Sequence, residues 1–138
     1  MPDKEKFLDS NVLIYAYYDR EKDKQAISRE LISNNKTIIS TQVLQEMSNV
    51  LNRKFNADYD TIKPLLLECI SNCGKVHTNT QSTVLLACDI AKRYSYSYYD
   101  SLIISAALEA NCDTLYSEDM QNGQIIEKVL RIVNPFGG

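Results

Sequence analysis

The chain has 138 residues, of which 44% are hydrophobic and 24% are charged, and its 15 Lys and Arg against 18 Asp and Glu give a net charge of −3. These proportions are ordinary for a soluble globular protein and exclude a disordered tail or a fibrous or collagen-like chain. The net charge excludes binding of polyanions through bulk basicity, so a nucleic-acid role requires a local basic patch or a metal ion. With no linker or repeat, residues 1–138 are expected to form one domain.

The first residues of the chain and its cysteines indicate the cellular compartment in which the protein is expected to work. No apolar run approaches the roughly 18 residues of a membrane span, and Met1–Lys6 mixes charges where a signal peptide would be apolar. We therefore expect a cytoplasmic protein whose four cysteines are reduced and buried. Cys69, Cys73 and His77 recur every four residues and suggest zinc ligands, but Gly74 is expected to end the helix between them and a fourth ligand is lacking. Burial is the favoured interpretation.

Short apolar runs typical of strands alternate with longer helical patterns. In chain order they predict a strand at Lys6–Leu8, a helix at Asn11–Tyr18, a helix from Asp23 to Asn34–Asn35, a strand at Thr37–Ile39, helices at Thr41–Arg53 and Ile62–Cys73, a strand at Lys75–His77, helices at Ser82–Tyr94 and Ser101–Ala110, and strands at Thr114–Tyr116 and Leu130–Val133. Five strands separated by helices predict a five-stranded parallel sheet covered on both faces, a three-layer α/β/α architecture.

Local signals refine the helices. Ser10 is expected to cap the first helix, and Asp100 to open the last one. Pro64 is tolerable only in the first turn of its helix, where its missing N–H is not needed. The helix at Ser82–Tyr94 is expected to turn inward Leu85, Cys88 and one of Ala87 and Ala91.

Four acidic residues fall where a parallel sheet collects its ligands, beyond the carboxyl ends of the strands. Asp9 directly follows the first strand, and Asp119 lies just past the fourth. Glu46 lies beside the apolar stripe of the helix after the second strand, and Asp100 lies where the last helix begins. The four carboxylates are expected to converge on one pocket, and carboxylate oxygens are ligands that Mg²⁺ prefers.

Each of these acids also has a plainer interpretation. Asp100 can be a helix N-cap, Asp119 can belong to a turn, and Glu46 can be a solvated acid favoured by the helix dipole. Asp9 is harder to explain in this way because it interrupts an apolar segment. Four acids at one end of a predicted sheet, taken together, support a divalent-metal site about as well as they support the plainer interpretations.

Four segments resemble the motifs of PIN-domain ribonucleases, a family that includes the VapC toxins. They occur in family order and are Phe7–Tyr15 (FLDSNVLIY), Thr41–Glu46 (TQVLQE), Tyr98–Ala107 (YYDSLIISAA) and Leu115–Met120 (LYSEDM). One segment alone is a weak signal, but the ordered set spans nearly the whole chain. Tyr99 stands where Trp is common in the family, and Glu118 beside Asp119 leaves open which acid enters the site.

The resemblance implies a parallel sheet in the order 3-2-1-4-5 and an endoribonuclease that depends on Mg²⁺ or Mn²⁺, the toxin of a toxin–antitoxin pair. It assigns metal binding and catalysis to Asp9, Glu46, Asp100 and Asp119, with supporting polar groups at Ser10, Asn11 and Ser117. Its implied partners are an RNA substrate and a small antitoxin protein, and we also expect a homodimer and no membrane association.

The composition agrees with metal-dependent chemistry. Metal-free ribonucleases typically use a general acid and a general base, often two histidines, whereas this chain has only His77, which is expected to be structural. RNA positioning is expected from Arg53, Lys54, Lys92, Arg93, Tyr94 and Tyr96. The basic residues among them can equally complement helix dipoles. Tyr99 is expected to pack in the core.

Two other functions stay open from the residues. A phosphatase with an aspartate nucleophile also begins with a strand that ends in Asp, but its chemistry needs a second Asp where this chain has Asn11. A catalytically inactive PIN-like interaction domain would keep the fold, although the presence of all four acids argues against it.

Overall fold

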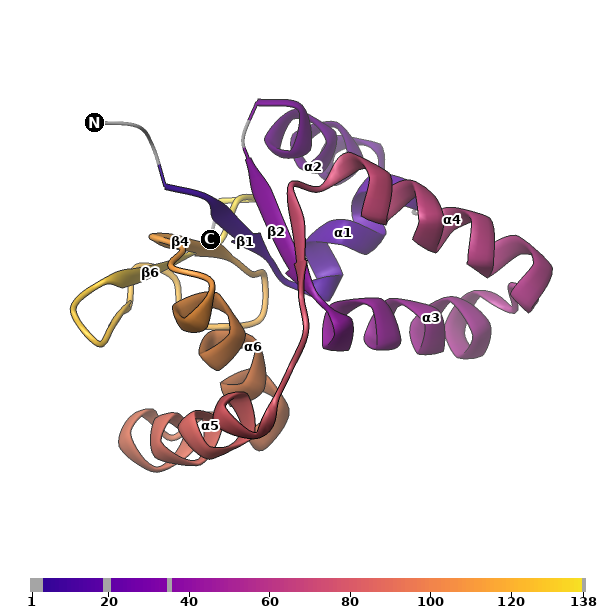
Figure 1. Ribbon diagram of the computed structural model, residues 1–138. Coiled ribbons are helices and arrows are strands. Elements are labelled where there is room, and N and C mark those ends of the chain that lie inside the picture. Colours follow the sequence, from indigo (N-terminus) through magenta and orange to yellow (C-terminus); the bar gives the residue numbers. More distant parts are fainter. Residues whose placement is uncertain (1–3, 19–20, 35, 138) are drawn as a thin grey trace.

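The computed structural model describes residues 4–18, 21–34 and 36–137 (Figure 1). Its strands are β1 (Lys6–Leu8), β2 (Thr37–Ser40), β3 (Lys75–His77), β4 (Thr114–Tyr116), β5 (Ile125–Ile126) and β6 (Leu130–Val133). Its helices are α1 (Ser10–Tyr17), α2 (Lys22–Asn34), α3 (Thr41–Phe55), α4 (Tyr59–Asn72), α5 (Gln81–Tyr94) and α6 (Tyr98–Glu109). Asn35, where we expected the second helix to end, lies outside the described residues.

The sheet has six strands in the order β3-β2-β1-β4-β6-β5. The five predicted strands are all present and parallel to their neighbours, in the order that the resemblance implies. The prediction of a five-stranded sheet is corrected by β5, which pairs antiparallel with β6 at the edge. The turn between them holds Glu127 and Lys128 at φ of 51° and 65°. Such turns usually carry Asn or Gly, so the sequence gives no hairpin signal here.

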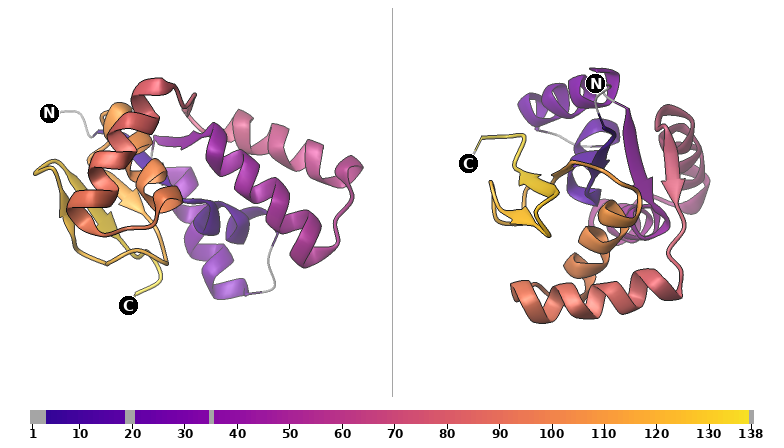
Figure 2. Two further views of the ribbon diagram at one scale, coloured as in Figure 1. Left: turned by 90° about the horizontal axis from the view of Figure 1, so that it is seen from below. Right: turned by 60° about the vertical axis from the view of Figure 1, so that its left-hand side comes forward.

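Helices flank the sheet in two groups. α1 packs against α2 and α3, and α3 packs against α4. α5 packs along α6, which contacts β2 and β4. Figure 2 shows the α5–α6 pair set apart from the group formed by α1 to α4. The architecture is therefore a central, mainly parallel sheet with helices around it, as predicted. No described helix is long and apolar enough to cross a membrane.

The core lies around the central strands. Phe7 of β1, Ile39 of β2 and Leu115 of β4 are fully buried, which explains why apolar residues occupy these positions of the strands. α6 is buried along most of its length, from Ser101 to Ala107. A helix that is apolar on all sides is expected to lie inside the protein, and α6 does so.

Several helix ends differ from the predictions. Asp9 rather than Ser10 caps α1, and its side chain accepts a hydrogen bond from the Ser10 backbone N–H. Ser97 caps α6 with a hydrogen bond from the Asp100 N–H to its Oγ, so Asp100 lies inside the first turn and is not a cap. Pro64 lies in the second turn of α4, because the helix begins at Tyr59 after its cap.

The prediction for the inner face of α5 is confirmed at Ala87 and wrong at Leu85 and Cys88. Ala87 and Ile90 are buried against the rest of the protein, whereas Leu85 is 67% exposed and Cys88 is exposed. Leu85 and Cys88 therefore form an apolar surface on the outer side of the helix. Periodicity alone does not distinguish an outward apolar stripe from an inward one.

The zinc interpretation finds no support among the described residues. Cys69 is buried and its Sγ lies 3.7 Å from the Met47 Sδ, while Cys73 follows the end of α4. His77 instead contacts Glu109, with 3.0 Å between Nε2 and Oε1. The three side chains thus serve different parts of the fold.

Candidate active site

The four predicted acids lie at the carboxyl-end edge of the sheet, where β1 and β4 run side by side. Leu8 and Tyr116 are register partners, and the Asp9 N–H donates to the Tyr116 carbonyl at 3.0 Å. Glu46 comes from α3, which follows β2 directly. Asp100 comes from the first turn of α6. Parallel pairing and short strand–helix connections therefore bring segments together that are about 110 residues apart in the chain.

Asp9 is the most buried of these acids, with 5% exposure. Its Oδ1 accepts from the Ser10 N–H at 2.7 Å, and its Oδ2 accepts from the Ser117 hydroxyl at 2.8 Å. Burial raises the pKa of Asp9 to about 7, the two hydrogen bonds oppose this shift, and the negative charges of Glu46 and Asp100 add to it. A carboxylate that is costly to ionise is a group that a nearby cation would stabilise strongly.

Glu46 is held from two sides. Its Oε1 accepts from the Ser10 hydroxyl at 3.1 Å, and its Oε2 accepts from the Gln42 side-chain amide at 3.2 Å. The same Gln42 Nε2 donates to the backbone carbonyl of Tyr99 at 3.0 Å, which joins α3 to the start of α6. Gln42 has 5% exposure, and its Oε1 finds no partner among the described residues.

Sequence analysis missed Gln42 as a site residue. Gln42 and Glu46 are four residues apart on one helix, so their side chains lie on the same face, and this spacing is the signal that could have identified it.

Asp119 is oriented by Asn11, which lies in the first turn of α1. The Asn11 side-chain amide donates to the Asp119 Oδ2 at 2.9 Å, and the Asn11 Oδ1 accepts from the Glu118 N–H at 3.3 Å. The Asp119 N–H donates to the Ser117 hydroxyl at 3.3 Å. Asn11 and Ser117 therefore link the end of β4 to the start of α1.

Glu118 points to a different set of partners. Its carboxylate lies 2.5 Å from the Lys24 Nζ and accepts from the Tyr15 hydroxyl at 2.8 Å. Partial burial acts to raise the pKa of Glu118, but the hydrogen bonds from Lys24 and Tyr15 outweigh it and hold the pKa below its usual value. Lys24 also lies over the rings of Tyr15 and Phe136. Glu118 is thus neutralised by protein groups, in contrast to Asp119.

Asp100 completes the electrostatic connection among the acids. Partial burial raises the pKa of Asp100, the hydrogen bond with Ser97 opposes this, and the negative charge of Asp119 adds to the rise. Asp100 in turn raises the pKa of Asp9. The four carboxylates therefore form one coupled anionic cluster at the sheet edge.

The donor chemistry of this cluster fits a hard divalent cation. All four acids offer carboxylate oxygens, and an oxygen that accepts one hydrogen bond keeps a lone pair for a metal. Within the described part of the chain, however, no three His, Cys, Asp or Glu side chains are gathered closely enough to hold an ion. Joint binding of an ion by these residues would therefore require the carboxylates to lie closer together than they do here.

A groove of about 290 Å³ is lined by residues of α1 and α3 and by the segment that follows β4. Among its lining residues are Ser10, Asn11, Lys54, Phe55, Glu118 and Asp119. Arg53 lines a neighbouring hollow together with Lys54. Of the residues expected to position RNA, Lys54 therefore shares a surface with a predicted acid.

The other residues expected to position RNA are placed elsewhere. Arg93 pairs with Glu127, and the Tyr94 hydroxyl donates to Glu127 at 2.8 Å. The Tyr96 hydroxyl lies 2.5 Å from the Gln124 Oε1. These hydrogen bonds connect the segment that carries β5 to Tyr94 at the end of α5 and to Tyr96 just after it, so the hydroxyls of both tyrosines are engaged within the fold. Lys92 lines a shallow hollow with Arg93 on α5.

The prediction that Tyr99 packs in the core is wrong. Tyr99 is 66% exposed and Tyr98 is 40% exposed. The family-typical position before Asp100 therefore presents an aromatic ring to solvent rather than to the core.

His77 has the structural role expected of it. Its partner Glu109 also accepts hydrogen bonds from the hydroxyls of Ser82 and Thr83 at the start of α5. This network ties β3, α5 and α6 together, and none of the hydrogen bonds described for it involves the four acids.

The fold and the cluster of acids at its sheet edge define the class to which the chain belongs. A family model described as "PIN domain" matches residues 6–122, and the chain is a member of the PIN domain family. No curated relative matches the chain in sequence.

Three solved structures with similar folds are a toxin and two toxin–antitoxin complexes. VapC20 of Mycobacterium tuberculosis, described as a sarcin-ricin loop cleaving toxin, is 17% identical with a TM-score of 0.64, over 83% of this chain and 89% of that one. VapBC2 of Rickettsia felis, bound to a DNA fragment from its promoter, is 18% identical with a TM-score of 0.66, over 94% and 99%. A toxin–antitoxin complex of Klebsiella pneumoniae is 20% identical with a TM-score of 0.67, over 96% and 98%. Identities this low show a shared fold.

Proposed function

We propose that the chain is a ribonuclease of the VapC type that depends on a divalent metal and acts as the toxin of a toxin–antitoxin pair. The observation that carries the proposal is the buried Asp9, whose pKa is raised to about 7 beside Glu46 and Asp100. A core position that holds a poorly ionised carboxylate next to two others is costly for folding. Such a cost is understandable where the cluster binds a cation and does chemistry.

Asp9, Glu46, Asp100 and Asp119 would hold Mg²⁺ or Mn²⁺, whose presence would supply a more acidic water and electrostatic stabilisation of the phosphate. Ser10, Ser117 and Asn11 orient the carboxylates through the hydrogen bonds described above. Gln42 does the same for Glu46 and keeps α3 beside α6. Lys54, on the groove shared with Asp119, would contact a neighbouring phosphate of the substrate.

An RNA substrate is expected to be cut by hydrolysis. The single histidine is engaged with Glu109, so the chain offers no histidine pair to activate the ribose 2′-hydroxyl. Water is then the nucleophile, and the products carry 5′-phosphate and 3′-hydroxyl ends. The measurement is incubation with cellular RNA, with and without Mg²⁺ or Mn²⁺, followed by mapping of the ends. A 2′,3′-cyclic phosphate would contradict this mechanism, and no cleavage under any metal would favour an inactive PIN-like interaction domain.

A small antitoxin is the proposed protein partner, because two of the structures with this fold contain a toxin with its antitoxin. The groove beside the acids offers a place for it. Ile14, Tyr15, Val50 and Phe55 give its walls apolar surface, and Asp119 lies in the same groove. A segment with an apolar side chain and a cationic one would match this surface and would block access of RNA to the carboxylates.

A homodimer is proposed through the outer side of α5. Leu85 is 67% exposed and Val84 is 40% exposed, next to the exposed Cys88. We predict that Leu85→Asp shifts the protein from dimer to monomer in light scattering after gel filtration, because it buries a charge in an apolar contact. Leu67→Asp on α4, at a position that is 57% exposed, is the control and should leave the mass unchanged. A wild type that is monomeric at all concentrations would contradict the dimer.

A further inference from the structure

Two exposed aromatic side chains begin the helix that carries a candidate acid. Tyr98 and Tyr99 are the first residues of α6, directly before Asp100, and they are 40% and 66% exposed. Neither hydroxyl is hydrogen-bonded to another side chain in the described part of the chain, in contrast to Tyr15, Tyr94 and Tyr96. The two rings therefore present apolar faces to solvent, and their hydroxyls do not join distant segments of the described chain through side-chain hydrogen bonds.

The backbone beneath these rings is held firmly. Ser97 caps α6, and the Tyr99 carbonyl accepts the hydrogen bond from Gln42 that also holds Glu46. The rings contact each other edge to face, with centroids 5.5 Å apart and planes at 71°. A T-shaped pair leaves at least one full ring face open, and each ring limits the freedom of the other. The pair is thus preorganised relative to the carboxylates.

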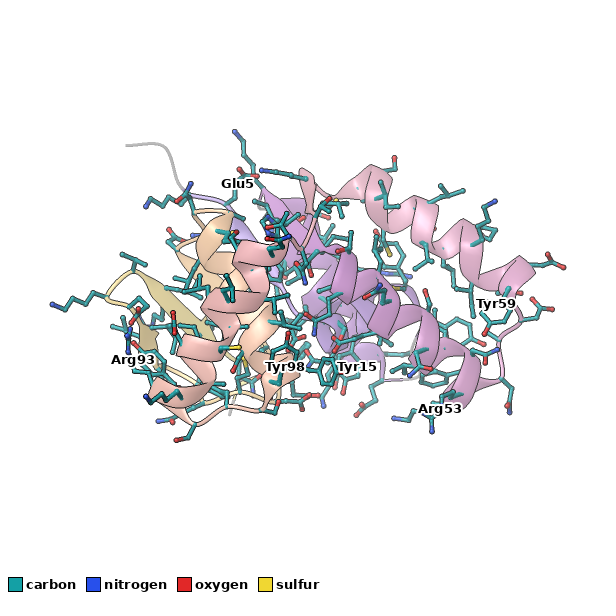
Figure 3. The ribbon with its side chains drawn as sticks, turned by 60° about the horizontal axis from the view of Figure 1, so that its bottom comes forward. Glu5, Tyr15, Arg53, Tyr59, Arg93 and Tyr98 are labelled. Carbon is teal, nitrogen blue, oxygen red and sulfur yellow. The ribbon has the colours of Figure 1, made fainter. Side chains whose placement is uncertain are left out.

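The position of the pair matters as much as its exposure. In Figure 3, Tyr98 lies where the α5–α6 pair meets the group formed by α1 to α4. Lys54 shares a groove with Asp119, whereas Tyr99 directly precedes Asp100 on α6 and its carbonyl accepts the Gln42 hydrogen bond. A cation and an aromatic pair are therefore each next to one of the candidate acids.

We propose that Tyr98 and Tyr99 form a stacking platform for an unpaired base of RNA next to the phosphate that is cut. The inference rests on the proposed ribonuclease function and assigns two residues of this chain to holding the RNA beside the cleavage site. Every base has a π-face, and stacking on an aromatic side chain contributes about 1–3 kcal/mol per base. A base within a duplex already stacks on its neighbours and is not free to do so. The platform selects for unpaired structure rather than for one sequence.

The test measures RNA binding separately from cleavage. A short single-stranded RNA that contains 2-aminopurine is titrated with protein in the Asp9→Asn background with Mg²⁺ present, which prevents cutting. Stacking should quench the 2-aminopurine fluorescence. Tyr98→Ala and Tyr99→Ala should each raise the Kd by roughly 5- to 100-fold, which corresponds to the stacking energy of one base. Tyr98→Phe and Tyr99→Phe should bind like the parent, because the ring face and not the hydroxyl makes the contact.

A matched control is Tyr59→Ala. Tyr59 on α4 is 67% exposed, almost the same as Tyr99, and Figure 3 places it at the other end of the molecule from the α5–α6 pair. Its replacement should leave the Kd unchanged. In cleavage assays with the otherwise wild-type chain, Tyr99→Ala should raise KM with little change in kcat, because stacking stabilises bound RNA before and during the reaction alike. A fully complementary duplex should be cut more slowly than the single strand.

The platform is overturned if the alanine variants bind RNA as tightly as Tyr59→Ala, or if a duplex is cut as fast as the single strand. It is also overturned if the alanine variants lower the molecular mass in solution without changing the Kd, which would make the tyrosines a contact between copies. Failure of the proposed ribonuclease function can be distinguished from failure of the stacking platform. A wild type that cuts no RNA, yet binds single strands through these tyrosines, contradicts the ribonuclease and supports the platform.

Discussion

Asp9→Asn is expected to lower the rate of RNA cleavage by about 100-fold or more while the protein stays folded, because several kcal/mol of metal-dependent stabilisation are lost. Asn has nearly the same volume as Asp and can still accept the hydrogen bond from the Ser10 N–H that caps α1. The Ser117 hydroxyl can turn to accept from the new amide. The measurement is initial cleavage rate against metal concentration, with the circular dichroism spectrum as a check of folding.

The neighbouring acids provide a matched pair of controls. Asp119→Asn should lower cleavage to a similar degree, because Asp119 is coupled to Asp100 and has no basic side chain to neutralise it among its described partners. Glu118→Gln should stay active, since Glu118 is already neutralised by Lys24. The reverse result at positions 118 and 119 would show that Glu118, and not Asp119, enters the site.

The stability of the metal-free protein is expected to fall as pH rises from 5 to 7. The pKa of Asp9 is about 7 in the folded protein against an ordinary value of 3.8, so the folded state keeps a proton that the unfolded chain has released. The free energy of unfolding then falls by at most about 1.4 kcal/mol for each pH unit in this window, and it levels off above the pKa of Asp9 in the folded protein. Groups with lowered pKa values, such as Asp113 and Glu118, lose their stabilising charge only at lower pH. The measurement is the free energy of unfolding in chelator against pH.

The matched variant for this experiment is again Asp9→Asn. It should be more stable than the wild type at pH 8 in chelator, and its stability should change much less between pH 5 and 7. Glu118→Gln should keep the wild-type slope, because the pKa of Glu118 is lowered rather than raised. A wild type whose stability rises from pH 5 to 7 would show that Asp9 is not a destabilising charge in the fold.

Added Mg²⁺ or Mn²⁺ is expected to stabilise the wild type, and most at neutral pH or above, where protons no longer compete for Asp9. At a metal concentration 100 times the Kd the gain is about 2.7 kcal/mol. Asp100→Asn should melt at or above the wild type in chelator and gain much less from metal. Since Ser97 caps α6, this substitution removes charge without removing a cap. If metal and chelator leave the wild-type Tm unchanged, the metal site proposed here is wrong.

Much of the fold could be predicted because its elements are strong and local. β1, β2 and β4 each have buried apolar residues, and α3 has a clear apolar face, so their type and their order along the chain were predicted correctly. Asp9 and Asp119 were placed at one sheet edge by the rule for parallel strands, and both lie there. β5 could not be predicted, since two residues with no turn signal become a strand only by pairing with β6.

Apolar periodicity and chain connectivity predicted the parallel strands and placed Asp9, Glu46, Asp100 and Asp119 near their carboxyl ends, because both are properties of local residues. The order of the strands was implied by the resemblance of four segments to PIN-domain motifs. Tertiary structure alone decided the roles of the tyrosines and of the two faces of α5. The Tyr94 hydroxyl donates a hydrogen bond to Glu127 of the β5–β6 turn and so holds that turn against α5. The Tyr99 hydroxyl has no hydrogen-bond partner among the described residues, and its ring stays exposed. Leu85 faces outward because α6 covers the opposite face of α5. An aromatic or apolar side chain acquires its role from what packs against it, and that depends on contacts between elements distant in the chain.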